Sequence, residues 1–223
     1  MDVLEAIQAR HSVRDFVSKP VLKDIVMKIM EVATRSPSAG NGQPWEIFIA
    51  SGATMENIRR AYQERAQGEV GGPPRPDPDR PGGPPPLPAF IQERMATIRN
   101  ERMKLLGLNP ADPASGKVFM EWGCRLFGVP VLAVICMDKA LSSNFDIGML
   151  TQTICLAAQN FGVDSLIASA FVTQPDVLRK ELEIPESLNI VIGIGLGYPN
   201  PKSIINTYRS PRRPIQEVVR YKG

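Results

Sequence analysis

A run of prolines and glycines at residues 68–88 restricts the fold of this chain more than any other feature. Fourteen of these 21 residues are proline or glycine, a composition that excludes both a regular helix and a central strand. We therefore expect an insertion here, extended or mobile. Two roles remain open for it: a functional loop near a pocket, or an excursion without a function.

The length and charge of the chain narrow its class. With 223 residues, 43% of them hydrophobic and 22% charged, it is long enough for one sizeable core, and one domain over 1–223 is expected. A net charge of +3 suits a small anionic ligand but not a nucleic-acid partner. No apolar run reaches the ~18 residues that a membrane span needs, so no membrane association is expected, and no signal peptide is predicted.

The sparse cysteines and the single histidine exclude several chemistries. Cys124, Cys136 and Cys155 form no CxxC pair, which indicates reduced thiols in a cytoplasmic protein. We interpret Cys136 and Cys155 as small core residues. His11 is the only histidine, so neither a metal site nor a Ser-His-Asp triad is expected.

Hydrophobic periodicity predicts alternating helices and strands, and therefore an α+β fold. Asp2 and Glu5 resemble a capping box at the start of a first helix. Thr173, Pro175 and Asp176 have the order of residues that opens a helix. Further helices are expected at about 22–33, 54–66, 89–106 and 146–161, and strands at about 45–49, 129–137, 165–168 and 190–196.

The segment Arg10-His11-Ser12-Val13-Arg14 gathers groups that bind anions. Guanidinium groups offer forked donors to phosphate oxygens. In an extended segment, Arg10, Ser12 and Arg14 point to one side and Val13 to the other. The alternative is that the two arginines only cap the first helix at its C-terminal end.

Two further segments carry groups suited to a flat, phosphorylated ligand. Residues 36–45, SPSAGNGQPW, combine small residues with the amides of Asn41 and Gln43; the alternative is an ordinary helix-to-strand turn. The tail at 209–214, RSPRRP, is either a basic surface segment or a second set of cations for the same phosphate. Gly193-x-Gly195-x-Gly197 is rejected as a dinucleotide fingerprint because Tyr198-Pro199 stands where a helix should begin.

Taken in order, four motifs resemble the FMN-dependent nitroreductase family: RHSVRDF, PSAGNGQPW, DIG with Gln152 four residues after Gly148, and a C-terminal R-x-P followed by Glu217-Val218-Val219. The resemblance covers nearly the whole chain, except about 55–115. It implies a nitroreductase-like α+β sandwich, with a mixed, mostly antiparallel sheet flanked by helices. It also implies an intertwined homodimer with FMN at the interface. The implied reaction passes hydride from NADH or NADPH through flavin N5 to a small acceptor such as a nitroaromatic, quinone or activated alkene.

The resemblance also implies roles for individual residues. The cofactor-binding positions are Arg10, His11, Ser12, Arg14, Pro37, Ser38, Ala39, Asn41, Ser169, Ala170, Arg209 and Arg212. Arg10, Ser12 and Arg212 match phosphate-binding positions. Residues 37–39 match a loop that reaches the flavin from the other chain. No catalytic residue is obligatory because the flavin performs the hydride transfer; Arg14 and the backbone of Ser169 assist.

The part of the chain that departs from the family pattern is expected to act on the substrate side. Residues 68–106, the insertion followed by a lid-like helix at about 89–106, should shape access of the acceptor. The side of this helix expected to be buried carries Ile91, Met95, Ile98, Arg102 and Leu105. Phe90, Ile91 and Met95 would form an apolar lid surface, with Arg94 and Arg99 placed to meet an anionic acceptor. Two other functions remain open: a flavin-binding redox sensor without turnover, and a reductive dehalogenase-type relative.

Overall fold

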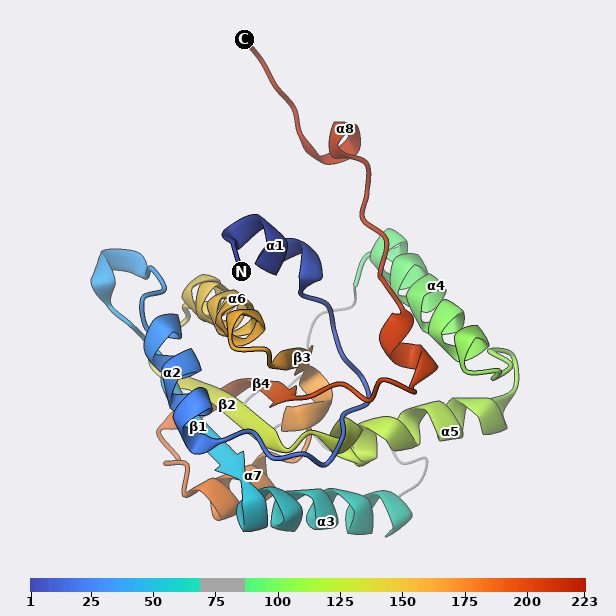
Figure 1. The fold of residues 1–223 in the computed structure, drawn as a ribbon, viewed down its shortest axis with the longest axis horizontal. Helices are drawn as coiled ribbons and strands as arrows, with labels where there is room; N and C mark the ends of the chain where they lie inside the picture. Colours follow the sequence, from blue (N-terminus) through green and yellow to red (C-terminus); the bar gives the residue numbers. More distant parts are fainter. Residues whose placement is uncertain (69–86) are drawn as a thin grey trace.

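The computed structural model describes residues 1–68 and 87–223, so most of the run at 68–88 lies outside the described residues. The fold is α+β, as expected: helices cover both faces of a four-stranded antiparallel sheet (Figure 1). The strands, in spatial order, are β1 (Glu46–Ser51), β2 (Val131–Asp138), β4 (Leu188–Gly197) and β3 (Asp164–Ala168). Outside these strands, the described residues also form an isolated parallel bridge between Ser12 and Ser165.

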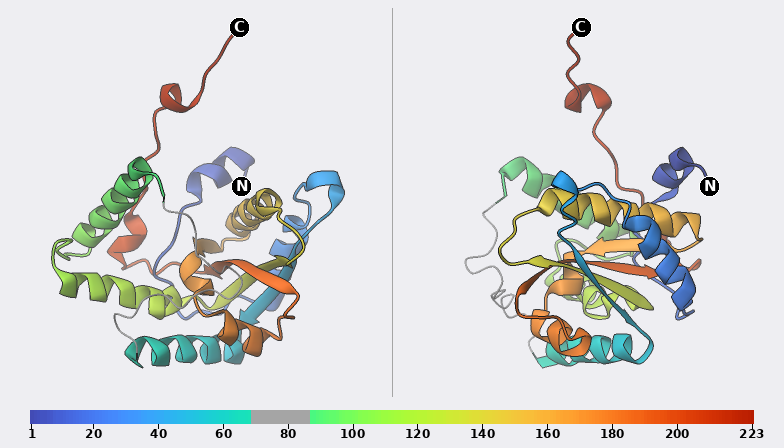
Figure 2. Two further views of the ribbon diagram at one scale, coloured as in Figure 1. Left: turned by 180° about the vertical axis from the view of Figure 1, so that it is seen from behind. Right: turned by 90° about the vertical axis from the view of Figure 1, so that its left-hand side faces the viewer.

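The helices form two layers around the sheet. The α-helices are α1 (Val3–Ala9), α2 (Lys23–Ala33), α3 (Gly52–Gly68), α4 (Ala89–Leu105), α5 (Pro113–Cys124), α6 (Asn144–Asn160), α7 (Pro175–Leu182) and α8 (Ile215–Val218). Short 3-10 turns lie at η1 (Ala39–Asn41), η2 (Leu126–Gly128), η3 (Ser169–Val172) and η4 (Ile204–Thr207). In the views of Figure 2, α2 and α6 lie on one side of the sheet and α3 and α7 on the other. Among the described residues, no helix is long and apolar enough to cross a membrane.

Burial of both faces of β2 explains why its sequence is a continuous apolar run. Its odd-numbered residues from Val131 to Met137 pack in the core beneath α2 and α6. Its even-numbered residues Leu132, Val134 and Cys136 pack in the second core, beneath α3 and α7. A strand buried on both faces needs apolar side chains at every position. Cys136 and Cys155 are buried in these cores, as expected for small core residues.

Three glycines in β4 allow other segments to approach the sheet closely. A Cβ on Gly193 would lie 2.4 Å from Phe171 Cβ, and one on Gly195 would lie 2.8 Å from Phe171 Cζ. A Cβ on Gly197 would lie 2.8 Å from Phe16 Cδ1. The glycines are spaced by two because alternate residues of a strand share a face. The G-x-G-x-G pattern is therefore a packing surface, in agreement with the rejection of a dinucleotide fingerprint.

Two helix expectations were wrong in detail. Helix α7 begins at Pro175 with Gln174 at its N-cap and no side-chain cap. Thr173 instead donates its hydroxyl to the Ala170 carbonyl at 3.2 Å, because η3 places that carbonyl within its reach. In α4 the fully buried side chain is Met103, whereas Met95 is 58% exposed. Of the five residues expected on the buried side, Ile91, Ile98, Arg102 and Leu105 are half-buried, so the expectation fails at Met95 and missed Met103.

Candidate functional site

The segment from Arg10 to Arg14 runs as an extra extended segment beside β3. The N–H of Val13 donates to the Ser165 carbonyl at 3.1 Å, and Ser12 forms the parallel bridge with Ser165. Val13 is 0% exposed, whereas Arg10, Ser12 and Arg14 are half-buried. This alternation places the three polar side chains away from the core, which is the arrangement expected of an extended segment.

The helix-cap alternative holds in part, because Arg10 is the C-cap residue of α1 and its backbone N–H donates to the Ala6 carbonyl. His11 Nδ1 lies 2.9 Å from the Ala9 carbonyl oxygen, at the C-terminal end of α1. Helix α1 has no basic residue in its last turn. Among the described residues, the Arg10 guanidinium forms no ion pair with a carboxylate. The Arg10 guanidinium is therefore available to bind an anionic ligand.

Asn206 of η4 fixes the position of Arg14. The backbone N–H groups of Arg14 and Asp15 both donate to Asn206 Oδ1, at 2.9 and 3.2 Å. Asn206 Nδ2 donates in turn to the Asp15 carbonyl at 2.7 Å. Sequence reasoning missed this residue, which joins the cation-bearing segment to the start of the C-terminal tail.

The Arg14 guanidinium lies in a partly dry, positively charged environment. Its Nη1 donates to the Ser12 carbonyl at 3.0 Å. Burial, and then the positive charge of Arg102, lowers the pKa of Arg14 to about 10. Since both causes act against the charged form, an anion beside Arg14 would be favoured.

Turn η3 holds Ser169 and Ala170 at the end of β3, and two aromatic side chains fix it there. Phe171 is fully buried against the glycines of β4. Tyr62 of α3 donates its hydroxyl to the Phe171 carbonyl at 2.8 Å, and burial raises the pKa of Tyr62. On the other side, α5 packs against η3: a Cβ added at Gly123 would be in ordinary van der Waals contact with Ala170 Cβ, at 3.8 Å.

Asp146 anchors the loop that contains Pro37 to Asn41. It is 3% exposed, accepts from the Ala39 N–H at 3.3 Å and accepts from the Ser143 hydroxyl at 2.5 Å. Within the loop, Ser38 Oγ accepts from the Gln43 N–H at 3.0 Å. Gly40 and Asn41 adopt left-handed backbone with φ of 56° and 57°, which favours the glycine and asparagine found there.

Within one chain, the loop at residues 37–41 does not lie next to the cations of the segment Arg10–Arg14. In Figure 1 the loop projects beyond the ends of α2 and α6, on the side of the molecule opposite α4 and the start of the tail. Residues 37–41 are exposed, apart from the half-buried Ser38. The structure therefore groups Arg10–Arg14 with η3 and η4, and leaves residues 37–41 apart.

The two expected tail arginines have different surroundings. Arg209 Nη1 donates to the Asn206 carbonyl at 2.8 Å, which keeps Arg209 next to the segment that holds Arg14. Arg212 donates only to carbonyls of its own tail, those of Ser210 at 2.9 Å and Pro211 at 3.3 Å. No described contact joins Arg212 to Arg10.

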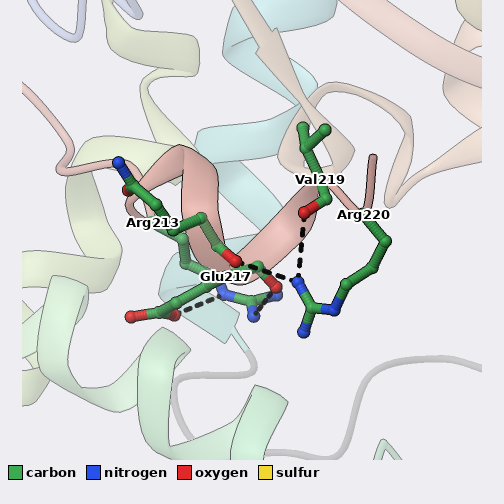
Figure 3. Close-up of polar contacts among 5 residues, drawn as sticks. Arg213, Glu217, Val219 and Arg220 are labelled. Carbon is green, nitrogen blue, oxygen red and sulfur yellow. Dashed lines mark hydrogen bonds and ion pairs between the residues drawn. The ribbon is translucent and has the colours of Figure 1, made fainter. Parts of the chain in front are cut away.

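Beyond Arg212 the tail leaves the body of the molecule (Figures 1 and 2). Arg213 Nε lies 3.1 Å from Glu217 Oε2, and Arg220 Nη1 donates to the Gln216 carbonyl at 2.9 Å. These contacts lie within the tail, around α8 (Figure 3). These hydrogen bonds therefore join residues of the tail to one another.

Helix α5 was not predicted, and it completes one wall of this region. Asp112 is its N-cap and accepts from the N–H groups of Ala114 and Ser115, with Pro113 in the first turn. Asp followed by Pro is a helix-start signal, so the sequence contained the information. Trp122 of this helix and Arg14 line one hollow of about 500 Å³. Among the described residues there is no group of three or more His, Cys, Asp or Glu side chains that could hold a metal ion.

Comparisons with known proteins identify the family of this fold. The sequence profile of the nitroreductase family matches residues 7–81 and 121–198. The chain is 31% identical to the nitrobenzene nitroreductase of Ectopseudomonas oleovorans, over 87% of this chain and 85% of that protein. It is 28% identical to the chloronitrobenzene nitroreductase of Comamonas testosteroni, over 96% and 93% of the two chains. The FMN-dependent nitroreductase NfnB of Mycobacterium smegmatis, solved in complex with NADPH, has a TM-score of 0.88 and 25% identity, over 99% of this chain and 97% of that chain.

Proposed function

The chain belongs to the nitroreductase family, and from this premise we propose that it is an FMN-dependent oxidoreductase. It takes electrons from NADH or NADPH and passes them to a small acceptor, with nitroaromatics as the first class to test. The observation that carries the proposal is the set of half-buried groups at Arg10, Ser12 and Arg14, held beside β3 and η3. The order of these residues agrees with the family resemblance in the sequence.

The residues present fit the phosphate of FMN. Arg10, Arg14, Arg209 and Arg212 form no ion pair with a carboxylate in the described part of the chain. The guanidinium groups of Arg14, Arg209 and Arg212 donate to backbone carbonyls. A phosphate offers charged acceptors to such donors, each contact contributing ~1.5–3 kcal/mol. We assign Arg10, His11, Ser12, Arg209 and Arg212 to the phosphate side.

The remaining assigned residues serve the flavin ring. Bound FMN supplies the redox chemistry, because it accepts a hydride equivalent from the nicotinamide and gives electrons to the acceptor. Arg14 would stabilise negative charge on the ring in a partly dry site. The backbone of Ser169 and Ala170 would face the ring edge, positioned by Phe171 and Tyr62. No protein acid or base is required, in keeping with the single histidine.

We also propose that the active form is a homodimer. The loop at 37–41 lies away from Arg10–Arg14 in one chain (Figure 1), so it reaches a flavin only if that flavin belongs to a second copy. The tail supports the same proposal, since it leaves the body while carrying exposed apolar side chains, among them Ile215, Val219 and Tyr221, the last 90% exposed. Exposed apolar groups of this kind are typical of surfaces that a partner covers.

We propose a cytoplasmic location, because the sequence has only three cysteines and they form no CxxC pair.

Two measurements test the proposed function. Heat-released cofactor, separated by chromatography, should be FMN; release of FAD, or a colourless protein indifferent to added FMN, would contradict the proposal. The holoenzyme should then oxidise NADH or NADPH at a rate that depends on added nitroaromatic. A flavin-binding sensor would hold FMN but would not turn over, and a dehalogenase-type relative would act on haloaromatics and leave nitro compounds unchanged.

The dimer has its own test. Sedimentation of the holoenzyme should show two chains per particle, with two flavins. A monomer that still binds FMN and turns over would contradict the assignment of residues 37–41 to a shared site.

A further inference from the structure

Helices α4 and α5 line an open hollow of about 420 Å³. Its volume lies toward the small end of the range for ligand pockets, ~300–1,000 Å³. It thus suits one substituted aromatic ring better than a dinucleotide. Most of its surface is apolar, and cations supply its polar groups. The side chains that matter here are Met95, Ile98, Phe119, Arg94, Arg99 and Arg102.

Arg102 is the cation placed deepest in this region. Its guanidinium carbon lies 5.5 Å from the centre of the Phe119 ring, and its Nε donates to the Ile98 carbonyl at 3.2 Å. Burial lowers its pKa, and the charge of Arg99 contributes in the same direction. Helix α4, which lines the hollow, packs on η4, and Asn206 of η4 accepts from the Arg14 N–H, so this helix adjoins the proposed flavin-binding segment.

These cations have no acidic partner among the described residues. Neither Arg99 nor Arg102 forms an ion pair there. The neighbouring acid on α4, Glu101, accepts from the Tyr208 hydroxyl at 2.6 Å. Several cations gathered without a counter-charge disfavour one another. A bound anion would relieve that repulsion.

We propose that Arg102, with Arg99 beside it and the Phe119 ring as a wall, binds the carboxylate of an aromatic electron acceptor. The proposal rests on the oxidoreductase function proposed above and adds a substrate class to it. A guanidinium presents two parallel donors to a carboxylate, while the apolar wall packs against the ring of the acceptor. In this arrangement Arg102 binds the carboxylate of the acceptor, and Arg14 stabilises negative charge on the flavin ring.

Kinetics with a matched pair of acceptors test the proposal. 4-Nitrobenzoate and 4-nitrobenzamide differ mainly in charge. In the holoenzyme, Arg102→Gln should lower kcat/KM for 4-nitrobenzoate about tenfold and leave 4-nitrobenzamide within about twofold. Arg102→Lys should restore part of the loss because it restores the charge. Lys104→Gln is the control, since it removes one exposed cation from the same helix outside the hollow.

Binding of unreactive analogues provides a readout that does not depend on turnover. Calorimetry on the holoenzyme should show tighter binding of benzoate than of benzamide, and Arg102→Gln should remove the difference. Equal losses with both acceptors would overturn the proposal. So would a loss confined to NADPH relative to NADH, since the anion bound at Arg102 would then be a nucleotide phosphate. If the wild type reduces neither acceptor yet binds benzoate through Arg102, the proposed function and the acceptor role both fail, and only an anion site remains.

Discussion

The sheet with the helices that cover its two faces, here called the body, differs from the pair of helices α4 and α5 in its packing and in its match to the family. The family profile matches residues 7–81 and 121–198 and leaves 82–120 unmatched, an interval that includes α4 and most of α5. The body has two cores, one on each face of β2. By contrast, α4 and α5 each contain one buried residue, Met103 and Ser115. The body is therefore held by two packed cores, whereas α4 and α5 contribute few buried side chains.

This difference separates two tasks that a flavin enzyme must perform. A cofactor needs fixed donors, and we propose that the body provides them where η3 and the Arg10–Arg14 segment are tied to β3 and Asn206. An acceptor needs a pocket that can differ between relatives. Helices with few core contacts can change their side chains without unfolding the protein. We therefore expect variants of the body to affect stability and FMN, and variants of α4 and α5 to affect the acceptor.

The largest expected effect is on stability and comes from the body. Phe171→Ala removes a fully buried ring and should lower the free energy of unfolding by ~3–5 kcal/mol. The matched variant Phe119→Ala, in the half-buried wall of the hollow, should cost clearly less, about 1–2 kcal/mol. Urea denaturation of both proteins gives the two values. Similar losses would mean that the helical pair is as firmly packed as the body.

FMN affinity should depend on the cations of the body and tail. Arg10→Ala and Arg212→Ala should each raise the FMN dissociation constant roughly tenfold or more, since each removes a charge-assisted contact to phosphate. Arg213→Ala is the control, because Arg213 already pairs with Glu217. Fluorescence titration of the apoprotein with FMN measures all three. If the FMN dissociation constant is unchanged in all three variants, Arg10 does not bind the phosphate and serves only at the end of α1.

Tyr62 should make the body sensitive to alkaline pH. Tyr62→Phe leaves the Phe171 carbonyl without its hydrogen bond and should cost about 1–2 kcal/mol at neutral pH. Burial raises the pKa of Tyr62 in the folded chain, so its contribution is full below the unfolded value of about 10 and falls as pH rises above it. Thermal unfolding across this range should decline more steeply in the wild type than in Tyr62→Phe. Equal slopes would contradict this assignment.

The smallest expected effect comes from the run outside the described residues. Replacing 68–88 by a short Gly-Ser linker should change the free energy of unfolding by less than about 1 kcal/mol, because loop-closure costs grow slowly with length. FMN should remain bound, while the relative rates with different acceptors should change by clearly more. Unchanged rates with every acceptor tested would show that this run has no part in acceptor access.

The parts of the fold that could be predicted are those whose signal is local. The apolar run of β2 and the spacing of α2 and α6 were sufficient to place these elements. Helix α5 was missed, although Asp112-Pro113 marks its start, because the pattern that follows is interrupted by Gly116 and Gly123. The exposure of Met95 was missed because periodicity predicts which residues share a face of a helix, but not which of them a neighbouring element covers.

In the candidate site, too, only the parts with a local signal in the sequence could be predicted. The N-terminal cations were predicted from five consecutive residues, and the structure places them beside β3. Asn206 and Asp146 were not predicted as positioning groups, because their partners are 192 and 107 residues away in the sequence. Arg102 was expected on the buried side of its helix, but its place in the fold depends on how α4 packs on η4. Contacts of this range follow only from the tertiary fold.

The central claim is that the body holds a flavin that exchanges electrons with a nicotinamide and then with an aromatic acceptor. An anaerobic absorbance measurement on the purified holoenzyme tests it most directly. Addition of NADH or NADPH should bleach the oxidised flavin spectrum, and one nitroaromatic acceptor should then restore it, in Lys104→Gln as in the wild type. A bound flavin that neither nucleotide reduces, or that no nitroaromatic reoxidises, would contradict the account.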